Sequence, residues 1–285
     1  MMSAMDAEAY RADSRERWEA AAPGWGRYRE DIQRDAMEVS RWMLDAARLQ
    51  PGHTVLELAA GTGELGLMAA ELVAPGGRAI VTDGAEAMVA LARERAKEVG
   101  AANVEVRAME AEWIDLPAAS VDAVLSRWGY MLLADPEAAL RETRRVLRPG
   151  GRLALAAWDA AEHNPWLTRI GRVMVERGLM EQVPPGTPGP LAFGEPGRIE
   201  ELLDAAGFDD VEVGALDFAF HAASLDDWWE HAVGTSGRIA GIVQGLSPAE
   251  HYAVRDAVDA AYAEFVQPDG AVTIPARTLV AAASA

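Results

Sequence analysis

The chain begins with two segments in which apolar residues recur every three or four positions, the spacing of an amphipathic helix. These segments are 7–20 and 31–48. A turn-rich hinge, Ala22-Pro23-Gly24-Trp25-Gly26, separates them, and Pro51-Gly52 ends this part of the chain. We therefore expect residues 1–50 to form an N-terminal helical lid.

From residue 54 onward, short apolar runs alternate with helix-like segments, which is the pattern of parallel strands joined by crossover helices. We expect strands at 54–58, 78–82, 104–107, 121–126, 152–157, about 210–219 and 271–282. Helices are expected at about 63–73, 85–99, 135–148 and 196–206. The third of these helices has an Asp135 N-cap followed by Pro136, a strong start signal. The predicted fold class is α/β, with a doubly wound, mostly parallel, seven-stranded Rossmann-like sheet.

The alternation of strands and helices is interrupted twice after the fifth strand. Segment 159–195 contains a short helical piece and a loop rich in Pro and Gly, and segment 224–268 is mostly helical. In an open α/β sheet, ligands bind beyond the carboxyl ends of the strands. Both segments start or end near that edge of the predicted sheet. We expect a core at 51–158, and a remainder at 159–285 that completes the sheet and carries these two insertions as helical caps. Together they form one structural domain.

Composition narrows the class of protein. The 26 Lys and Arg residues against 45 Asp and Glu give a net charge of −19, which repels nucleic acid and anionic lipid. The absence of cysteine excludes disulfides and thiolate chemistry, and the five histidines lack metal-ligand spacing, so no metal is expected. Residues 1–18 lack the apolar centre of a signal peptide. We expect a cytoplasmic protein without nucleic-acid partners or membrane insertion. Its oligomeric state is open, with a homodimer as one option.

The most informative segment runs from Val55 to Gly66, where an apolar strand ends in Glu57 and a glycine loop leads into a helix. Glycines allow a ligand to approach the backbone, and the helix start offers free N–H groups. With Asp83 about 20 residues on, the segment also matches the dinucleotide fingerprint. Three features favour S-adenosylmethionine instead: the acidic strand end, the late first glycine and the long segment before the first strand. Asp83 could accept both ribose hydroxyls, cap the following helix, or do both.

Several motifs together resemble those of class I S-adenosylmethionine-dependent methyltransferases, the group that includes the ubiquinone/menaquinone C-methyltransferases and many small-molecule methyltransferases. The resemblance runs from about Trp18 to Pro165. Its signature segments are 55–63, 82–88, 109–112, 116–124 and 145–152.

The resemblance implies S-adenosylmethionine as the cofactor, with Glu57 on its ammonium group, Asp83 on its ribose and Glu110 on its adenine amino group. The full set of implied cofactor residues is Glu57, Ala59, Gly61, Thr62, Gly63, Asp83, Gly84, Met88, Glu110, Ala111 and Arg127. The sequence departs from the family pattern at Ala59, where glycine is usual, and at Glu110, where aspartate is common. Met88 also has the helical spacing of a core residue.

The expected reaction is in-line methyl transfer to a small aromatic or apolar molecule that lies under the lids. The candidate acceptor-binding residues are aromatic: Trp25, Tyr28, Trp128, Tyr130 and Trp166. His163, in the loop after the fifth strand of the core, is the candidate general base. Three alternatives stay open: an NAD(P)-dependent oxidoreductase, an RNA or protein methyltransferase, and a non-catalytic protein that binds the cofactor.

Overall fold

The computed structural model describes residues 4–184 and 186–285 of the chain. Within these residues, seven strands form one sheet in the order β3-β2-β1-β4-β5-β7-β6. Their bounds are β1 Thr54–Glu57, β2 Arg78–Asp83, β3 Val104–Ala108, β4 Val121–Arg127, β5 Leu147–Trp158, β6 Asp209–Ala222 and β7 Val272–Ser284. The first five strands are parallel, and β7 runs antiparallel between β5 and β6. The predicted doubly wound, mostly parallel sheet is therefore confirmed.

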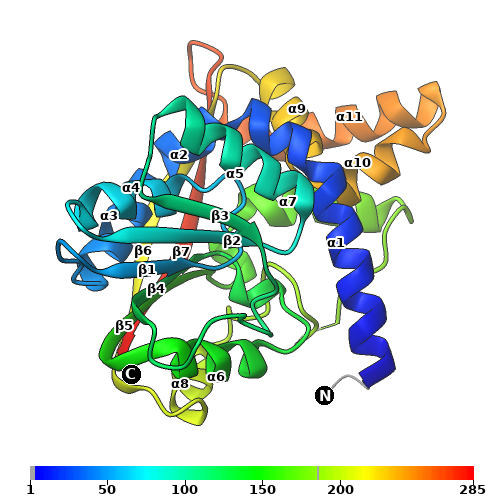
Figure 1. Cartoon of the computed structure of the whole chain (residues 1–285). Coiled ribbons are helices and arrows are strands. Elements are labelled where there is room, and N and C mark those ends of the chain that lie inside the picture. The colour runs from blue at the N-terminus through cyan, green and yellow to red at the C-terminus, as the bar shows by residue number, and fades with distance from the viewer. Residues whose placement is uncertain (1–3, 185) are drawn as a thin grey trace.

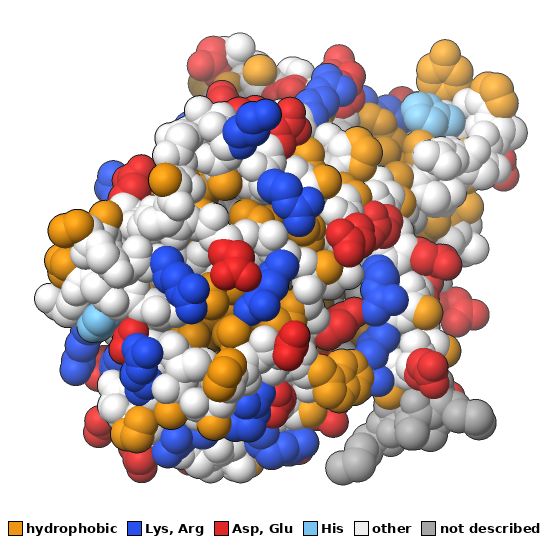
Figure 2. Space-filling view, in the orientation of Figure 1, with side chains coloured by type: hydrophobic (Ala, Val, Ile, Leu, Met, Phe, Trp, Pro, Cys, Tyr) orange, Lys and Arg blue, Asp and Glu red, His pale blue; other side chains and the backbone are white. Residues whose placement is uncertain are grey.

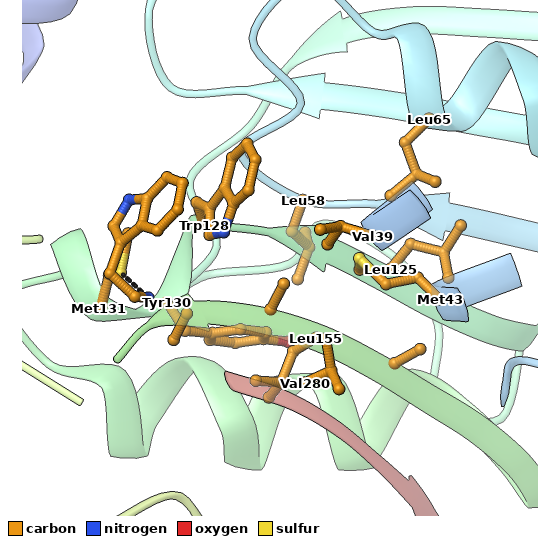
Figure 3. Packing of buried hydrophobic residues seen from close by; sticks show 14 of the residues in the cluster. Val39, Met43, Leu58, Leu65, Leu125, Trp128, Tyr130, Met131, Leu155 and Val280 are labelled. Atoms are coloured by element: carbon orange, nitrogen blue, oxygen red, sulfur yellow. Dashed lines mark hydrogen bonds between the residues drawn. The ribbon is translucent and has the colours of Figure 1, made fainter. Parts of the chain in front are cut away.

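Helices cover both faces of the sheet. Figure 1 shows α4 (Glu64–Val73) and α5 (Glu86–Glu98) on one side of it, and α6 (Pro136–Val146) and α8 (Arg198–Ala205) on the other. Because β1 and β4 are covered on both faces, their residues form the continuous apolar runs seen in the sequence. Figure 3 shows this core, with Val39 and Met43 of α3 (Met37–Ala46) packed near Leu125 of β4.

The N-terminal segment differs from its prediction. The expected hinge at 22–26 does not form, and α1 continues through Pro23 from Ala4 to Arg27. Its partner is α9, since a Cβ on Gly24 would lie 1.9 Å from the backbone oxygen of Gly234. This close helix contact is possible only with a glycine, and we attribute the uninterrupted helix to it. The chain bends only afterwards, at Tyr28, before α2 (Arg29–Asp35) and α3.

The first predicted insertion begins with helical turns and continues as a loop, and the second is largely helical. The first contains η2 (Ala161–His163) and α7 (Pro165–Glu176). The second connects β6 to β7 and contains α9 (Leu225–Thr235), α10 (Gly237–Gln244), α11 (Pro248–Tyr262) and η3 (Ala263–Phe265). In Figure 1, α10 and α11 project from the body of the molecule, next to α1. Across the described residues, no helix has the length and apolar character that a membrane span requires.

Charged side chains of both signs are interspersed on the face shown in Figure 2. Arg145 at the end of α6 forms an ion pair with Glu142 at 2.7 Å. Arg148 lies in β5 and forms an ion pair with Asp122 of β4.

Candidate cofactor and acceptor site

The carboxyl ends of four adjacent strands bring the main candidate residues to one edge of the sheet. Glu57 ends β1, Asp83 ends β2, and Arg127 ends β4, while Glu110 follows β3 by two residues. Because these strands are parallel neighbours in the order β3-β2-β1-β4, their ends form a continuous row. This is the edge at which open α/β sheets bind ligands.

Glu57 is a buried carboxylate, 2% exposed. It accepts a hydrogen bond from the backbone N–H of Gly66 at 2.8 Å and forms no ion pair among the described residues. Burial raises the pKa of Glu57 to about 8, although the charge of Arg127 and the Gly66 N–H oppose the rise. A buried carboxylate that forms no direct ion pair is costly, and an ammonium group would supply one.

Gly66 allows α4 to pack directly on this carboxylate. A Cβ at position 66 would lie 2.4 Å from Glu57 Oε2 and 2.5 Å from Val81 Cγ2, well inside contact distance.

We therefore expect Gly66→Ala to destabilise the protein by about 1–3 kcal/mol, the usual cost of overpacking. Gly241→Ala is a matched control, since Gly241 is also helical and nothing lies within 4 Å of the added Cβ. The control should be stabilised by roughly 0.5–1 kcal/mol, because alanine favours the helix. Urea denaturation of both variants tests the prediction, and equal effects would contradict it.

The loop after β1 adopts left-handed backbone conformations at three positions: Ala59 (φ 50°), Gly61 (φ 57°) and Gly63 (φ 80°). Glycine tolerates this region, whereas alanine is strained there. The family's usual glycine at position 59 thus has a conformational reason, and Ala59 carries the strain. Thr62, between the two glycines, is buried at 6% exposure.

Asp83 ties the β1 and β2 loops together. Its Oδ2 accepts from the Gly61 N–H at 2.9 Å, and its Oδ1 accepts from the Ala85 N–H at 2.9 Å. Burial raises its pKa despite these two hydrogen bonds. Beside it, a Cβ on Gly84 would lie 3.0 Å from Glu110 Oε2, so a glycine lets the β2 and β3 loops approach. Asp83 therefore stabilises the turn between β2 and α5. Each of its carboxylate oxygens also has a further lone pair that can accept a hydrogen bond from a ligand.

Helix α1 contacts these loops through charged side chains, and sequence reasoning missed these contacts. Arg15 forms an ion pair with Glu110, and Arg11 forms one with the buried Glu112. Glu19 accepts hydrogen bonds from the first N–H groups of α5, at 2.6 and 3.0 Å. The sequence gives no sign of these pairings, because only the fold shows which loops the charged residues of α1 meet.

The apolar side of α1 covers the same loops. Met88 is 1% exposed and packs in a small cluster with Ala22 and Ala85, while Ala111 is also buried. The ring of Trp25 lies 3.7 Å from the position that a Cβ on Gly61 would take. Its Nε1 donates to the Thr235 carbonyl of α9 at 3.0 Å. Trp25 therefore lies over the glycine loop, closer to the predicted cofactor than to a separate acceptor site.

Arg127 anchors the lid helices to the end of β4. Its guanidinium donates to Ser40 Oγ at 2.6 Å and to Gln33 Oε1 at 3.1 Å. Burial lowers its pKa, and the charge of Glu57 opposes that effect. The guanidinium also lies 5.2 Å from the ring centroid of Trp128, whose backbone has φ 64°. Strain of this kind in a bulky residue is typical of functional sites.

An aromatic layer lies beyond the ends of β4 and β5. Trp128 stacks on Trp158 with centroids 4.2 Å apart, and Trp158 contacts Trp166 of α7 at 4.7 Å. Phe218 and Phe220 of β6 extend the layer, with Phe220 lying 4.9 Å from Trp166. Two of the predicted acceptor residues, Trp128 and Trp166, thus belong to one contiguous aromatic layer, in which Trp128 and Trp158 are buried.

Two other candidates lie elsewhere. Tyr130 is 2% exposed, and its hydroxyl hydrogen-bonds Thr143 of α6 at 2.6 Å. Figure 3 shows its ring beside Leu155 and Val280, so we assign it to core packing. His163 lies near Asp217 of β6, whose pKa is lowered mainly by its hydrogen bond to Arg277 and also by His163. The structure does not bring His163 together with Glu57 and Asp83, because β7 and β6 lie beyond β5 in the sheet.

An acidic strand end, a glycine loop and a second acidic residue on the next strand define a nucleoside-cofactor site on a doubly wound sheet. The family model described as a methyltransferase domain matches residues 55–151. The chain is 34% identical over 206 residues to the ubiquinone/menaquinone biosynthesis C-methyltransferase UbiE of Escherichia coli K12, covering 64% of this chain and 79% of that enzyme.

Two further comparisons agree. UbiE of Enterobacter sp. strain 638 is 34% identical over 167 residues, 52% of this chain. The match spans 66% of that relative, slightly less than two thirds of its length. The YcgJ protein of Bacillus subtilis has the same fold, with a TM-score of 0.58 at 19% identity over 87% of this chain and 98% of that one. The chain belongs to the class I S-adenosylmethionine-dependent methyltransferases. It is an enzyme of that type, with S-adenosylmethionine as its cofactor, and the oxidoreductase alternative is not favoured.

Proposed function

We propose that the protein transfers a methyl group to a small planar aromatic molecule bound on the layer of Trp128, Trp158 and Trp166. The contiguous aromatic layer that begins directly after Arg127 carries this proposal. Aromatic rings bind a flat apolar acceptor well through stacked and edge contacts. The UbiE relatives are named as C-methyltransferases of ubiquinone and menaquinone biosynthesis, and a ring-containing acceptor is consistent with those names.

The residues at the sheet edge fit the cofactor. Glu57 would hold its ammonium group, and the Gly61–Gly63 backbone would lie against its sugar and methionine parts. Asp83 would accept hydrogen bonds from the ribose. Glu110 and Ala111 would contact the adenine edge once the ion pair between Arg15 and Glu110 opens. When bound, S-adenosylmethionine supplies an activated methyl group.

The protein's own contribution is alignment of the acceptor and exclusion of water. Holding the reactants in the right orientation can lower the activation free energy by about 7–11 kcal/mol. We propose that residues 1–50 and the caps at 159–195 and 224–268 provide the enclosure. The contacts of α1 with the loops after β1, β2 and β3 support that role.

A panel of aromatic and aliphatic acceptors, incubated with S-adenosylmethionine carrying a labelled methyl group, tests this function. We expect label to appear in aromatic products and Trp128→Ala to reduce that incorporation. A preference for aliphatic amines, or for RNA or protein as the labelled product, would contradict the proposal.

A further inference from the structure

Two buried polar side chains lie at the outer end of the aromatic layer, where α9 meets the start of α2. Tyr28 is 6% exposed and His231 is 9% exposed. Their rings lie 4.7 Å apart, tilted by 33°. Phe220 and Trp228 flank the imidazole, with centroids 6.5 and 5.5 Å from it.

The polar atoms of this pair lack partners. Tyr28 Oη is buried and has no hydrogen bond. The imidazole of His231 makes ring contacts, but its nitrogens form no hydrogen bond with any residue that the structure describes. Buried polar groups in native proteins are nearly always paired, and an unpaired one is costly. The buried Tyr28 hydroxyl without a partner, beside an imidazole whose nitrogens form no hydrogen bond with the described residues, therefore indicates a place where a bound molecule supplies the partners.

The pair is connected to the cofactor loops from two sides. On one side, Phe220 contacts Trp158 at 6.1 Å, and Trp158 stacks on Trp128 next to Arg127. On the other side, Tyr28 lies about one helical turn after Trp25, which covers Gly61. Tyr28 and His231 thus form the polar end of a surface whose other end meets the methyl-donor site.

We propose that Tyr28 and His231 bind a hydroxyl group on the aromatic acceptor, and that His231 accepts the proton of that hydroxyl. This inference rests on the proposed function, which it deepens by specifying a hydroxylated aromatic ring. It also gives the role of general base to a residue other than His163.

The charge state of the imidazole suits this role. Burial lowers the pKa of His231, which keeps the ring neutral and able to accept a proton at neutral pH. The carboxylates of Asp31 and Asp35 on α2 and of Asp227 on α9 oppose this effect, while Arg34 acts in the same direction as burial. These carboxylates would stabilise the imidazolium once it forms.

The O–H bond of the acceptor breaks, and an N–H bond forms on His231, which leaves a negative oxygen on the ring and a positive imidazole on the protein. The electron pair left on the ring system makes it a better nucleophile, and a bond from it to the methyl group would form as the bond between that methyl group and the sulfonium breaks, which releases S-adenosylhomocysteine. The imidazolium then releases its proton to water, so the acceptor exchanges one proton for one methyl group overall.

Binding of 2-naphthol and naphthalene to the protein loaded with S-adenosylhomocysteine tests the inference without turnover. The two probes differ only in the hydroxyl group. We expect wild type to bind 2-naphthol about tenfold more tightly than naphthalene, as one good hydrogen bond to a buried partner provides. Tyr28→Phe and His231→Phe should each reduce that preference severalfold and leave naphthalene binding unchanged.

Tyr252→Phe is the matched control for Tyr28→Phe, since it removes the hydroxyl of a tyrosine that is 71% exposed. The control should keep the full preference, and melting curves should show that all variants fold. Equal binding of the two probes by wild type, or an undiminished preference in both variants, would overturn the inference. Loss of binding for every aromatic probe in wild type would instead overturn the proposed function, and affinity for S-adenosylhomocysteine is a separate readout of the cofactor site.

Discussion

Asp83→Ala is expected to weaken the binding of S-adenosylhomocysteine by about tenfold or more. Two effects combine in this variant. In the proposed site, the ribose would lose its hydrogen-bond acceptor. The β1 loop would also lose its hydrogen-bonded connection to the β2 loop, since Asp83 accepts from both Gly61 and Ala85. Hydrogen bonds to a charged group contribute about 1.5–3 kcal/mol each, and 1.4 kcal/mol already corresponds to a factor of ten in affinity.

Asp122→Ala is the matched control. Asp122 also lies on a central strand and accepts a backbone hydrogen bond, from Thr54 at 2.7 Å, but at the opposite end of the sheet. The control should lose stability and retain its affinity for S-adenosylhomocysteine. If calorimetry shows wild-type affinity in Asp83→Ala, Asp83 does not belong to the cofactor site.

Glu57→Gln is expected to have opposite effects on stability and on cofactor binding. The raised pKa of Glu57, about 8 against an ordinary value of 4.5, means that the folded protein disfavours the ionised carboxylate. This penalty grows as pH rises from about 4.5 to 8 and is complete above 8. The neutral amide avoids it, so the variant should melt at a higher temperature than wild type at pH 8.5, and this advantage should vanish near pH 4.5.

The same substitution should weaken cofactor binding by about tenfold or more, because the ammonium group loses its carboxylate partner. In wild type, affinity for S-adenosylhomocysteine should rise between pH 6 and 8 as Glu57 ionises, and Glu57→Gln should lose that rise. A variant that is less stable than wild type at pH 8.5 and binds the cofactor normally would refute this account of Glu57.

The sheet was largely predictable because its signals are local. Buried parallel strands give apolar runs, and Asp135-Pro136 marks a helix start, with Asp135 accepting from the Ala138 N–H at 2.9 Å. The β1 loop was also readable, since its left-handed positions call for glycine at 61 and 63. These features depend on residues that are close in the sequence, and they can therefore be recognised from the sequence alone.

The lids were less predictable because their structure depends on distant contacts. Pro23-Gly24 is typical of a turn, but the contact of Gly24 with Gly234 keeps α1 helical there. His231 looks like any histidine on a helix until the fold places it against Tyr28. Tyr130 follows Trp128 by only two residues, yet its hydroxyl reaches Thr143 on the opposite face of the sheet.

The central claim is that the loops after β1 and β2 form the site for S-adenosylmethionine through Glu57 and Asp83. Isothermal titration of S-adenosylhomocysteine at pH 8, with NADH in a parallel titration, tests it most directly. We predict one site for S-adenosylhomocysteine in wild type, severe weakening in Glu57→Gln and Asp83→Ala, and no heat from NADH. Unchanged affinity in both variants, or binding of NADH in place of S-adenosylhomocysteine, would contradict it.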